Sequence, residues 1–260
     1  MRIALGISYD GRAYQGWQSQ SSGRTVQDRL ESALSQLAAQ DITTVCAGRT
    51  DAGVHALMQV VHFDTTALRR DNAWVRGANA HLPRDISVEW ALGMPDTFHC
   101  RANALTRRYA YVLYLSPVRP SVHRGRVGWV MFPLDIERMR AAAHRLIGEH
   151  DFSSFRASQC QALSPVKDMR SITITQRGAF LHFEFEATAF LHHMIRNIMG
   201  CLVAVGRGKH PPAWISDVLQ ARERRIAAPT FAPDGLYFLG PRYDPQWGLP
   251  ERTPAYDGLP

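Results

Sequence analysis

The chain has 260 residues, of which 45% are hydrophobic and 20% charged, so it can bury a sizeable core and has the ordinary composition of a globular protein. Its four cysteines lie far apart in the sequence, which excludes a disulfide scaffold and the close ligand pairs of a zinc site. No stretch approaches the ~20 apolar residues that cross a bilayer, and the N-terminus does not resemble a signal peptide, so we expect a cytoplasmic protein with reduced thiols.

The net charge of +7 comes almost entirely from arginine. Lysine occurs only at positions 167 and 209, so the other 28 of the 30 basic residues are arginines. A guanidinium binds phosphate through a planar fork and stacks on bases, and this composition therefore favours a polyanionic partner such as nucleic acid. An arginine bias also follows from the base composition of a genome, so the charge by itself leaves both explanations open.

The first half of the chain predicts the element order β-α-β-β-α-β. Its first strand ends at the turn residues Asp10 and Gly11. Thr25 can cap the first helix, because Asp28 stands three residues later and apolar residues follow at helical spacing. The later strands are short runs rich in β-branched residues. The predicted strands are 2–9, 42–46, 57–63 and 86–91, and the predicted helices begin at 25 and span 72–80.

The second half predicts the same order again. Its clearest part is a hairpin around Arg177 and Gly178, whose second arm alternates apolar and polar side chains. Asp135 can cap a helix, and a more apolar helix ends near Gly206. From Pro241 onward there are five prolines in twenty residues, which predicts an irregular tail. The predicted strands are 108–115, 172–175, 181–187 and 235–239, and the predicted helices begin at 135 and span 190–205 and 213–222.

These patterns predict an α+β fold made of two ferredoxin-like (RRM-like) β-α-β-β-α-β halves with mainly antiparallel sheets. We expect an N-terminal half over residues 1–104, a C-terminal half over 105–240 that completes the active site, and a proline-rich tail over 241–260. We also expect a basic catalytic cleft between the halves. Such sheets often bind RNA, although a fold by itself does not establish a function.

The segment from Gly48 to Ala56 concentrates more chemistry than any other part of the chain. It places Arg49, Asp51 and His55 on a short link between two predicted strands. Its two glycines allow a sharp turn and a close approach to a ligand. Aspartate is also a common turn former, so Asp51 has a purely structural interpretation. A turn that needs only flexibility, however, has no use for all three polar side chains.

The same segment resembles the signature of the TruA family of tRNA pseudouridine synthases. Four further segments resemble motifs of that family in the expected order, and together they cover the chain from Ala4 to about Leu239. Five motifs in order are highly specific. They are the segments 48–56, 107–109, 151–156, 192–200 and 235–237.

The resemblance implies the pseudouridine synthase fold and the isomerisation of uridine to pseudouridine. It implies that Asp51 is catalytic, that Tyr109 contacts the base and that Arg196 forms an ion pair. It also implies a homodimer that acts on uridines 38, 39 and 40 in the anticodon stem-loop of tRNA.

A carboxylate suits the chemistry of this reaction. The bond between C1′ and N1 breaks, the uracil rotates and a bond to C5 forms, so no redox cofactor and no nucleotide hydrolysis is needed. Asp51 can act as a nucleophile at C1′ or C6, or accept a proton from C2′, and the sequence does not choose among these paths. A guanidinium favours the ionised carboxylate, and Arg196 is a suitable partner. His192, Arg196 and Gly200 are spaced to share one helix face.

Several other side chains are candidates for substrate binding. Tyr109 can stack on an extruded base while its hydroxyl handles a proton, or it can pack in the core. Arg49 can fill the gap left by the flipped nucleotide, hold a phosphate or have a structural role. Leu236 and Tyr237 either line the uracil pocket or form the core beneath it. The remaining candidates are His55, Arg107 and Arg108, with Arg12, Arg24, Arg76, Arg84 and Lys167 for phosphate contacts.

Other functions are possible from the residues alone. A non-catalytic RNA-binding protein could use two RRM-like halves, but no RNP1 pattern occurs. A pseudouridine synthase with another RNA target is a nearer alternative. A metal-dependent phosphoesterase would need ligands whose spacing matches no known metal motif, so we expect no bound metal, and we expect no membrane association. The ligands of such a phosphoesterase would be His62, Asp64, His150, Asp151, His192 and His193.

Overall fold

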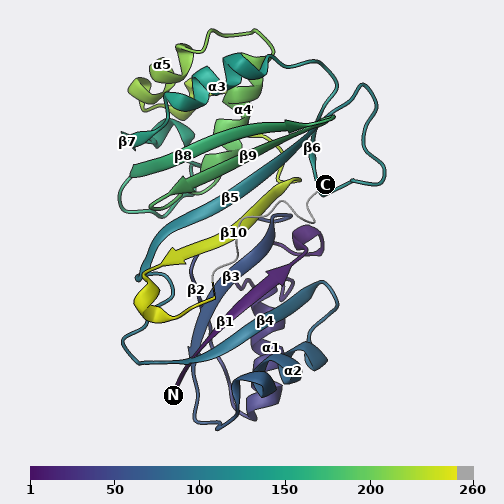
Figure 1. Ribbon diagram of the computed structural model, residues 1–260, viewed down its shortest axis with the longest axis vertical. Helices are drawn as coiled ribbons and strands as arrows, with labels where there is room; N and C mark the ends of the chain where they lie inside the picture. Colours follow the sequence, from purple (N-terminus) through teal and green to yellow (C-terminus); the bar gives the residue numbers. More distant parts are fainter. Residues whose placement is uncertain (251–260) are drawn as a thin grey trace. The chain divides into compact units, whose positions relative to one another are not determined.

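The computed structural model describes residues 1–250 of the chain, and it confirms an α+β protein (Figure 1). The chain forms two compact units. Unit 1 contains Met1–Arg107 and the described residues from Tyr237 onward, and unit 2 contains Arg108–Leu236. Residues 251–260 of the predicted tail lie outside the described residues. No helix in the described part of the chain has both the length and the apolar character that a membrane span requires.

Unit 1 has the element order that the sequence predicts, followed by a strand from the end of the chain. Its sheet has the order β4-β1-β3-β10, with β2 paired to β3. Strand β1 is antiparallel to both β3 and β4, whereas β10 is parallel to β3. The elements are β1 (Arg2–Tyr9), α1 (Val26–Ala38), β2 (Val45–Cys46), β3 (His55–Asp64), α2 (Asp71–His81), β4 (Ile86–Met94) and β10 (Leu236–Tyr243).

Helix α1 begins where the sequence indicates, because Thr25 and Asp28 cap each other. The Asp28 amide donates to the Thr25 hydroxyl, and the Thr25 amide donates to the Asp28 carboxylate, both at 3.2 Å. This capping box satisfies two amides that a helix start leaves without partners. In the same layer, Trp74 of α2 packs edge-to-face against Phe63 of β3, with ring centroids 5.2 Å apart. The two helices thus bury the apolar residues of β3 and its neighbours.

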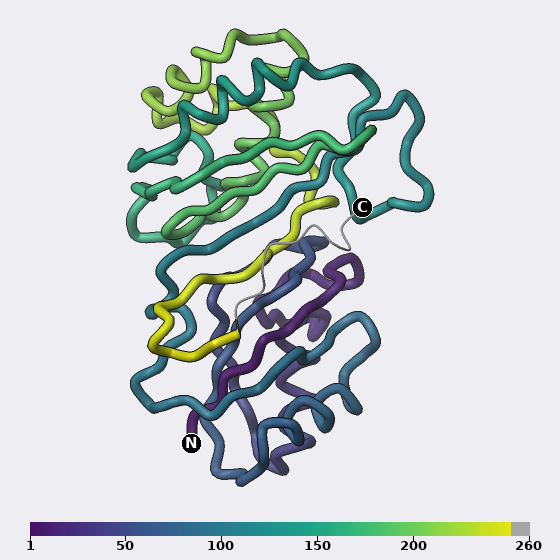
Figure 2. The backbone as a smooth tube through the Cα atoms, viewed as in Figure 1, coloured from purple at the N-terminus to yellow at the C-terminus, as the bar shows by residue number. Residues whose placement is uncertain are grey.

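The end of the chain builds a second core in unit 1. The rings of Tyr243 and Trp247 pack on Phe98 with centroid distances of 5.6 and 5.2 Å. The Tyr243 hydroxyl donates a 2.6 Å hydrogen bond to the carbonyl of Cys100. Figure 2 shows the yellow segment that contains β10 beside the blue strand β3 of unit 1. Residues 243–249 therefore pack against unit 1 even though their sequence predicts an irregular tail.

Unit 2 is built around a sheet with the order β5-β9-β8-β7, and β6 pairs in parallel with β5. The predicted hairpin is confirmed, since β8 and β9 are antiparallel and Gly178 takes the left-handed conformation at φ +58°. The elements are β5 (Ala104–Leu115, within unit 2 from Arg108), β6 (Gly128–Val130), α3 (Ile136–His144), β7 (Gly148–Asp151), β8 (Val166–Arg177), β9 (Phe180–Ala187), α4 (Met194–Gly206) and α5 (Trp214–Ala221).

Several predicted elements differ from the structure, and two strands were not predicted. The strand expected over 42–46 is only Val45–Cys46, because the amide of Ile42 donates to the Ser35 hydroxyl instead of to a strand. The helix expected over 190–205 begins at Met194, because His193 has a left-handed backbone at φ +62°. The last strand, expected over 235–239, continues to Tyr243 and pairs with β3. Strands β6 and β7 were not predicted, since both are very short.

His62 lies beside the second core of unit 1 and is only 4% exposed. Its ring contacts His99 at a centroid distance of 4.8 Å, and its Nδ1 accepts a 3.4 Å hydrogen bond from the Cys100 amide. Burial, together with the positive charge of Arg2 and the neighbouring His99, lowers the pKa of His62 from 6.5 to about 4. The folded protein therefore keeps this imidazole neutral at a pH where the unfolded chain protonates it.

We predict that His62 makes folding stability fall as the pH drops from 6.5 towards 4. The unfolded state binds the extra proton in this window, so the free energy of unfolding should lose about 2 kcal/mol between pH ~7.5 and pH ~5 through this residue. Urea unfolding at the two pH values measures this loss. The control is His62→Asn, whose side-chain oxygen can still accept from Cys100 and which should lack this part of the pH dependence. An equal loss in both proteins would contradict the prediction.

Candidate active site

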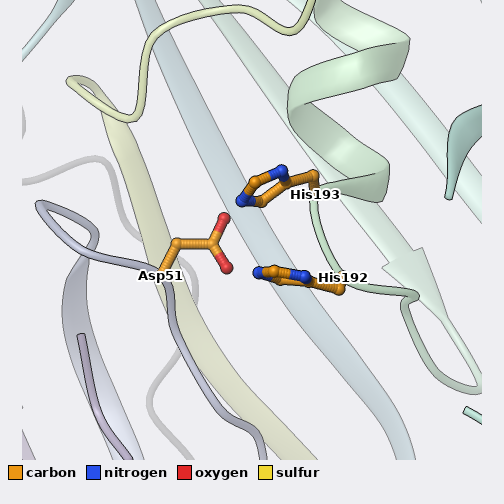
Figure 3. A group of neighbouring side chains, drawn as sticks. All are labelled: Asp51, His192 and His193. Carbon is orange, nitrogen blue, oxygen red and sulfur yellow. The ribbon is translucent and has the colours of Figure 1, made fainter. Parts of the chain in front are cut away.

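Asp51 lies on the loop between β2 and β3 in unit 1 (Figure 3). The residue before it, Thr50, is only 7% exposed, and its hydroxyl shares a 2.8 Å hydrogen bond with the buried hydroxyl of Tyr9. The carbonyl of Thr50 accepts a 3.0 Å hydrogen bond from the Trp17 amide, and the carbonyl of Asp51 accepts one of 3.1 Å from Val54. The backbone around the half-buried Asp51 is therefore held from both sides.

The start of the loop is fixed by a buried glutamine. The Gly48 amide donates to the side-chain oxygen of Gln59 at 3.3 Å, and the Gln59 amide donates back to the Gly48 carbonyl. Gln59 is fully buried on β3, so these bonds are shielded from water. Arg107, a predicted substrate-binding residue, donates to the carbonyls of Ala47 and Ala104 at 3.3 and 3.0 Å. Its guanidinium therefore supports the residue at which the loop begins.

Two glycines of the segment after β1 let the backbone approach the loop closely. A side chain at Gly11 would place its Cβ 2.0 Å from the carbonyl oxygen of Val54. At Gly16, where φ is +89°, a Cβ would lie 2.8 Å from the carbonyl oxygen of Thr50. Only glycine fits such contacts, so the segment 11–16 and the Asp51 loop are packed backbone against backbone.

His55 begins β3 and is 3% exposed. Its ring stacks on Tyr237 of β10 with centroids 4.6 Å apart, as the parallel pairing of these two residues requires. Its Nδ1 lies 3.2 Å from a carboxylate oxygen of Asp10 and 3.3 Å from the Gly11 amide nitrogen. The Gly11 amide donates to Nδ1, and the ring lies against the Asp10 carboxylate. His55 thus links β1, β3 and β10.

Asp10 is ionised in this arrangement. Burial opposes its charge, but the hydrogen bonds from Arg12 and the neighbouring His55 outweigh burial, and the pKa of Asp10 lies below its ordinary value. Arg49, next to Asp51 in sequence, is exposed. Tyr237 is 5% exposed and forms part of the wall beside His55.

The predicted site residues of unit 2 lie on β5, on α4 and at the first residue of β10. Tyr109 is 8% exposed and packs edge-to-face on Phe190, with ring centroids 5.1 Å apart. Arg196 donates through Nε to the carbonyl of Phe231 at 2.9 Å, and the Phe231 amide donates to the carbonyl of Arg196 at 3.0 Å. These two hydrogen bonds hold the backbone and Nε of Arg196 against the backbone of Phe231. Arg108 and Leu236 are also buried, at 6% and 5% exposure.

The helix-face prediction is wrong for His192. His192 and His193 precede α4 in the segment that Figure 3 shows, so only Arg196 and Gly200 have helical spacing. The two histidine rings lie 4.0 Å apart, and the backbone of His192 is tied to a loop of unit 2. Its amide donates to the Cys160 sulfur at 3.4 Å, and its carbonyl accepts from the Ala157 amide at 3.0 Å.

Sequence reasoning missed Asn197, which is fully buried in α4 beside Arg196. Its amide donates to the carbonyl of Phe155 at 2.7 Å, and its oxygen accepts from Thr230 and Arg224 at 2.7 and 3.1 Å. A buried amide that lost these partners would cost about 1–3 kcal/mol. An uncharged polar residue within the otherwise apolar run that follows Arg196 was the signal in the sequence that could have identified Asn197.

Some of the basic residues bond to other groups of the protein, whereas others lie on the surface. Lys167 donates to the carbonyls of Ser164 and Val166, and burial lowers its pKa. Other arginines are also used internally, for example Arg224 with Asn197 and Arg222 with Asp151. Arg24, Arg76 and Arg84 are exposed and are the predicted phosphate contacts that the structure leaves on the surface.

The ligands of the alternative phosphoesterase are engaged by protein groups. Asp64 forms a two-bond ion pair with Arg2 at 2.8 and 2.9 Å. Asp151 accepts from the Ser153 amide at 2.9 Å, and His150 lies 3.0 Å from the Ile147 carbonyl. Asp64, Asp151 and His150 thus already have partners within their own unit.

Comparison with known proteins decides the family of this chain. A family model described as tRNA pseudouridine synthase matches residues 6–101 and 142–244. The proteins called tRNA pseudouridine synthase A in Albidiferax ferrireducens and Polaromonas sp. JS666 are 66% and 67% identical, each over the full length of both chains. The chain belongs to the tRNA pseudouridine synthase family. The relative of the same name in Delftia acidovorans is 60% identical, again over both full lengths.

The ranges matched by the tRNA pseudouridine synthase family model contain the Asp51 loop, Arg196 and Tyr237, whereas Arg108 and Tyr109 fall between them. The full-length relatives cover that interval as well. In the crystal structure of a Cbf5-Nop10-Gar1 complex, one chain aligns with a TM-score of 0.34 and 11% identity, over 77% of this chain and 45% of that one. A similarity of that size supports no conclusion.

We predict that Gly16→Ala disturbs the Asp51 loop, whereas Gly23→Ala does not. Both glycines have positive φ, +89° and +63°, so each alanine should cost about 1 kcal/mol of left-handed strain. Only the Cβ at Gly16 also meets the loop, whereas no atom lies within 4 Å at Gly23. Gly16→Ala should therefore lose further stability and lower the rate of pseudouridine formation about tenfold or more. Urea unfolding and initial rates measure the two effects, and equal rates in the two variants would contradict the prediction.

Proposed function

We propose that this protein converts uridines 38, 39 and 40 in the anticodon stem-loop of tRNA to pseudouridine, with Asp51 as the catalytic group. Membership of the family supports the general activity, which is the isomerisation of uridine in tRNA. The observation that carries the role of Asp51 is the loop around it. Its neighbour Thr50 is buried and hydrogen-bonded to Tyr9 and Trp17, so a carboxylate is presented on a rigid backbone.

A rigid carboxylate suits this reaction because the bond from C1′ breaks and re-forms at one site. Asp51 is proposed to act as the nucleophile at C1′ or C6, or as the acceptor of a proton from C2′. Either function requires a fixed approach to a uridine that has left its stack, and misplacement by about 1 Å can cost a hundredfold in rate. The backbone bonds of the loop provide this fixation.

Residues of both units are proposed to act with Asp51. Tyr109 contacts the base, and Arg196 has the ion-pairing role that the family resemblance implies. Tyr237 and Leu236 line the uracil pocket, and Arg49 contacts the displaced nucleotide or its phosphate. His55, Arg107 and Arg108 are proposed as further substrate-binding residues, and for the first two the hydrogen bonds described above support an indirect role that holds the loop.

We predict that Asp51→Asn and Asp51→Ala abolish turnover and keep the affinity for tRNA, because the carboxylate does chemistry and does not hold the RNA. The assay uses tRNA transcripts labelled with tritium at C5 of uridine, whose release reports bond formation at C5. EDTA is present and no cofactor is added. Tritium release that stays near the native rate in Asp51→Ala would remove the central assignment.

Tyr109→Phe and Arg196→Lys, tested in the same way, should lose turnover if the hydroxyl and the planar fork are needed.

Transcripts with cytidine at positions 38, 39 and 40 provide the matched substrate control. They should bind with unchanged affinity and release no tritium. Release from these transcripts would show another target uridine. Binding without release from any transcript, by a well-folded native protein, would favour a non-catalytic RNA-binding protein.

We also infer that the protein is a cytoplasmic homodimer. The support is the resemblance to the TruA family. Light scattering at the concentration used for the assay should give twice the mass of one chain. The mass of a single chain at that concentration would contradict the dimer.

A further inference from the structure

Asp10 forms a charged centre immediately after β1. Its two oxygens accept from Nε of Arg12 at 2.9 and 3.0 Å, and Nη2 of Arg12 donates to Oδ2 at 2.5 Å. On the other side, Oδ1 lies 3.2 Å from Nδ1 of the buried His55. One carboxylate therefore holds two side chains, of which Arg12 is 45% exposed and His55 is 4% exposed at the side chain.

The position of Asp10 is itself fixed. Its amide donates a 2.9 Å hydrogen bond to the carbonyl of Asp85, at the start of β4. Its carboxylate also accepts from the Arg12 amide at 3.2 Å and so caps the short 3-10 turn Gly11–Ala13. The backbone bonds on both sides leave the carboxylate little freedom to move away from His55 and Arg12.

A short series of contacts connects this centre to Asp51. Gly11 directly follows Asp10, and its Cα packs against the carbonyl of Val54 so closely that a Cβ would come within 2.0 Å. The amide of Val54 in turn donates to the carbonyl of Asp51 at 3.1 Å. A displacement of residues 10 and 11 is therefore passed to the loop through hard backbone contacts.

The charged centre also reaches Tyr237, through the ring of His55. The ring of His55 is stacked on Tyr237 at 4.6 Å. The hydrogen bond to Asp10 raises the pKa of Arg12. Asp10 thus lies beside the ring that stacks on Tyr237.

We propose that Asp10 is a positioning residue of the active site, whose carboxylate holds His55 and Arg12 and through them sets the geometry of the Asp51 loop and Tyr237. The inference rests on the proposed role of Asp51. It assigns Asp10 no contact with the reacting uridine, so its effect belongs in the rate of the chemical step and not in tRNA binding.

The chain contains a matched control for this proposal. Arg2 of β1 and Asp64 of β3 form the same kind of two-bond pair, at 2.8 and 2.9 Å, in the same unit. That pair lies at the opposite ends of the strands, away from the Asp51 loop. Asp64→Asn therefore removes an equivalent ion pair without touching the proposed network.

The experiment compares Asp10→Asn with Asp64→Asn in the tritium-release assay and in thermal unfolding. Asp10→Asn keeps an oxygen that can cap the turn but removes the charge between His55 and Arg12. We expect kcat to fall about ten- to hundredfold while KM changes less than about threefold. Asp64→Asn should keep the native kcat and KM with a similar change in unfolding temperature.

A native kcat in a folded Asp10→Asn protein overturns the proposal. A change confined to KM also overturns it, because it would make the pair of Asp10 and Arg12 an RNA contact. If Asp10→Asn is too unstable for kinetics, Arg12→Gln breaks the same pair and leaves the carboxylate in place. It should then lower kcat at least tenfold, and an unchanged kcat again overturns the proposal. Failure of the proposed function is distinguishable, because Asp51→Ala would then remain active.

Discussion

Thr50 is buried directly beside Asp51, and its hydroxyl shares with Tyr9 a hydrogen bond that solvent does not reach. A buried hydroxyl without a partner costs about 1–3 kcal/mol, so the loop has a strong preference for the conformation that keeps this bond. The Trp17 amide holds the carbonyl of the same residue. The proposed catalytic carboxylate therefore projects from a fixed backbone.

Other residues of unit 1 also hold the Asp51 loop in this conformation. Gln59 lies inside the sheet and holds the first residue of the loop, and glycines at 11 and 16 allow the neighbouring segment to approach it. Such buried polar groups stabilise one arrangement strongly, because any alternative leaves donors and acceptors unpaired in a medium of low dielectric constant. In unit 2, Asn197 does the same for the start of α4, where Arg196 lies.

Local signals in the sequence were sufficient for most of the elements. The capping box at Thr25, the alternation in β9 and the turn at Gly178 depend on near neighbours in the chain, and the structure confirms each of them. The segment around Asp51 was also evident from the sequence, because so many polar groups on a short link between strands are unusual. Family membership followed from the order of the motifs and agrees with the comparisons.

The tertiary structure alone decided what lies next to that segment. No local pattern shows that β10 pairs with β3, because the partners Tyr237 and His55 are far apart in sequence and meet only through hydrogen bonds between strands. The same holds for Asp10 beside His55 and for Phe98 under Tyr243. The sequence by itself thus determined most of the elements and singled out the Asp51 loop. The supports of the loop depend on long-range burial and pairing, whose free energy appears only when the whole unit has folded.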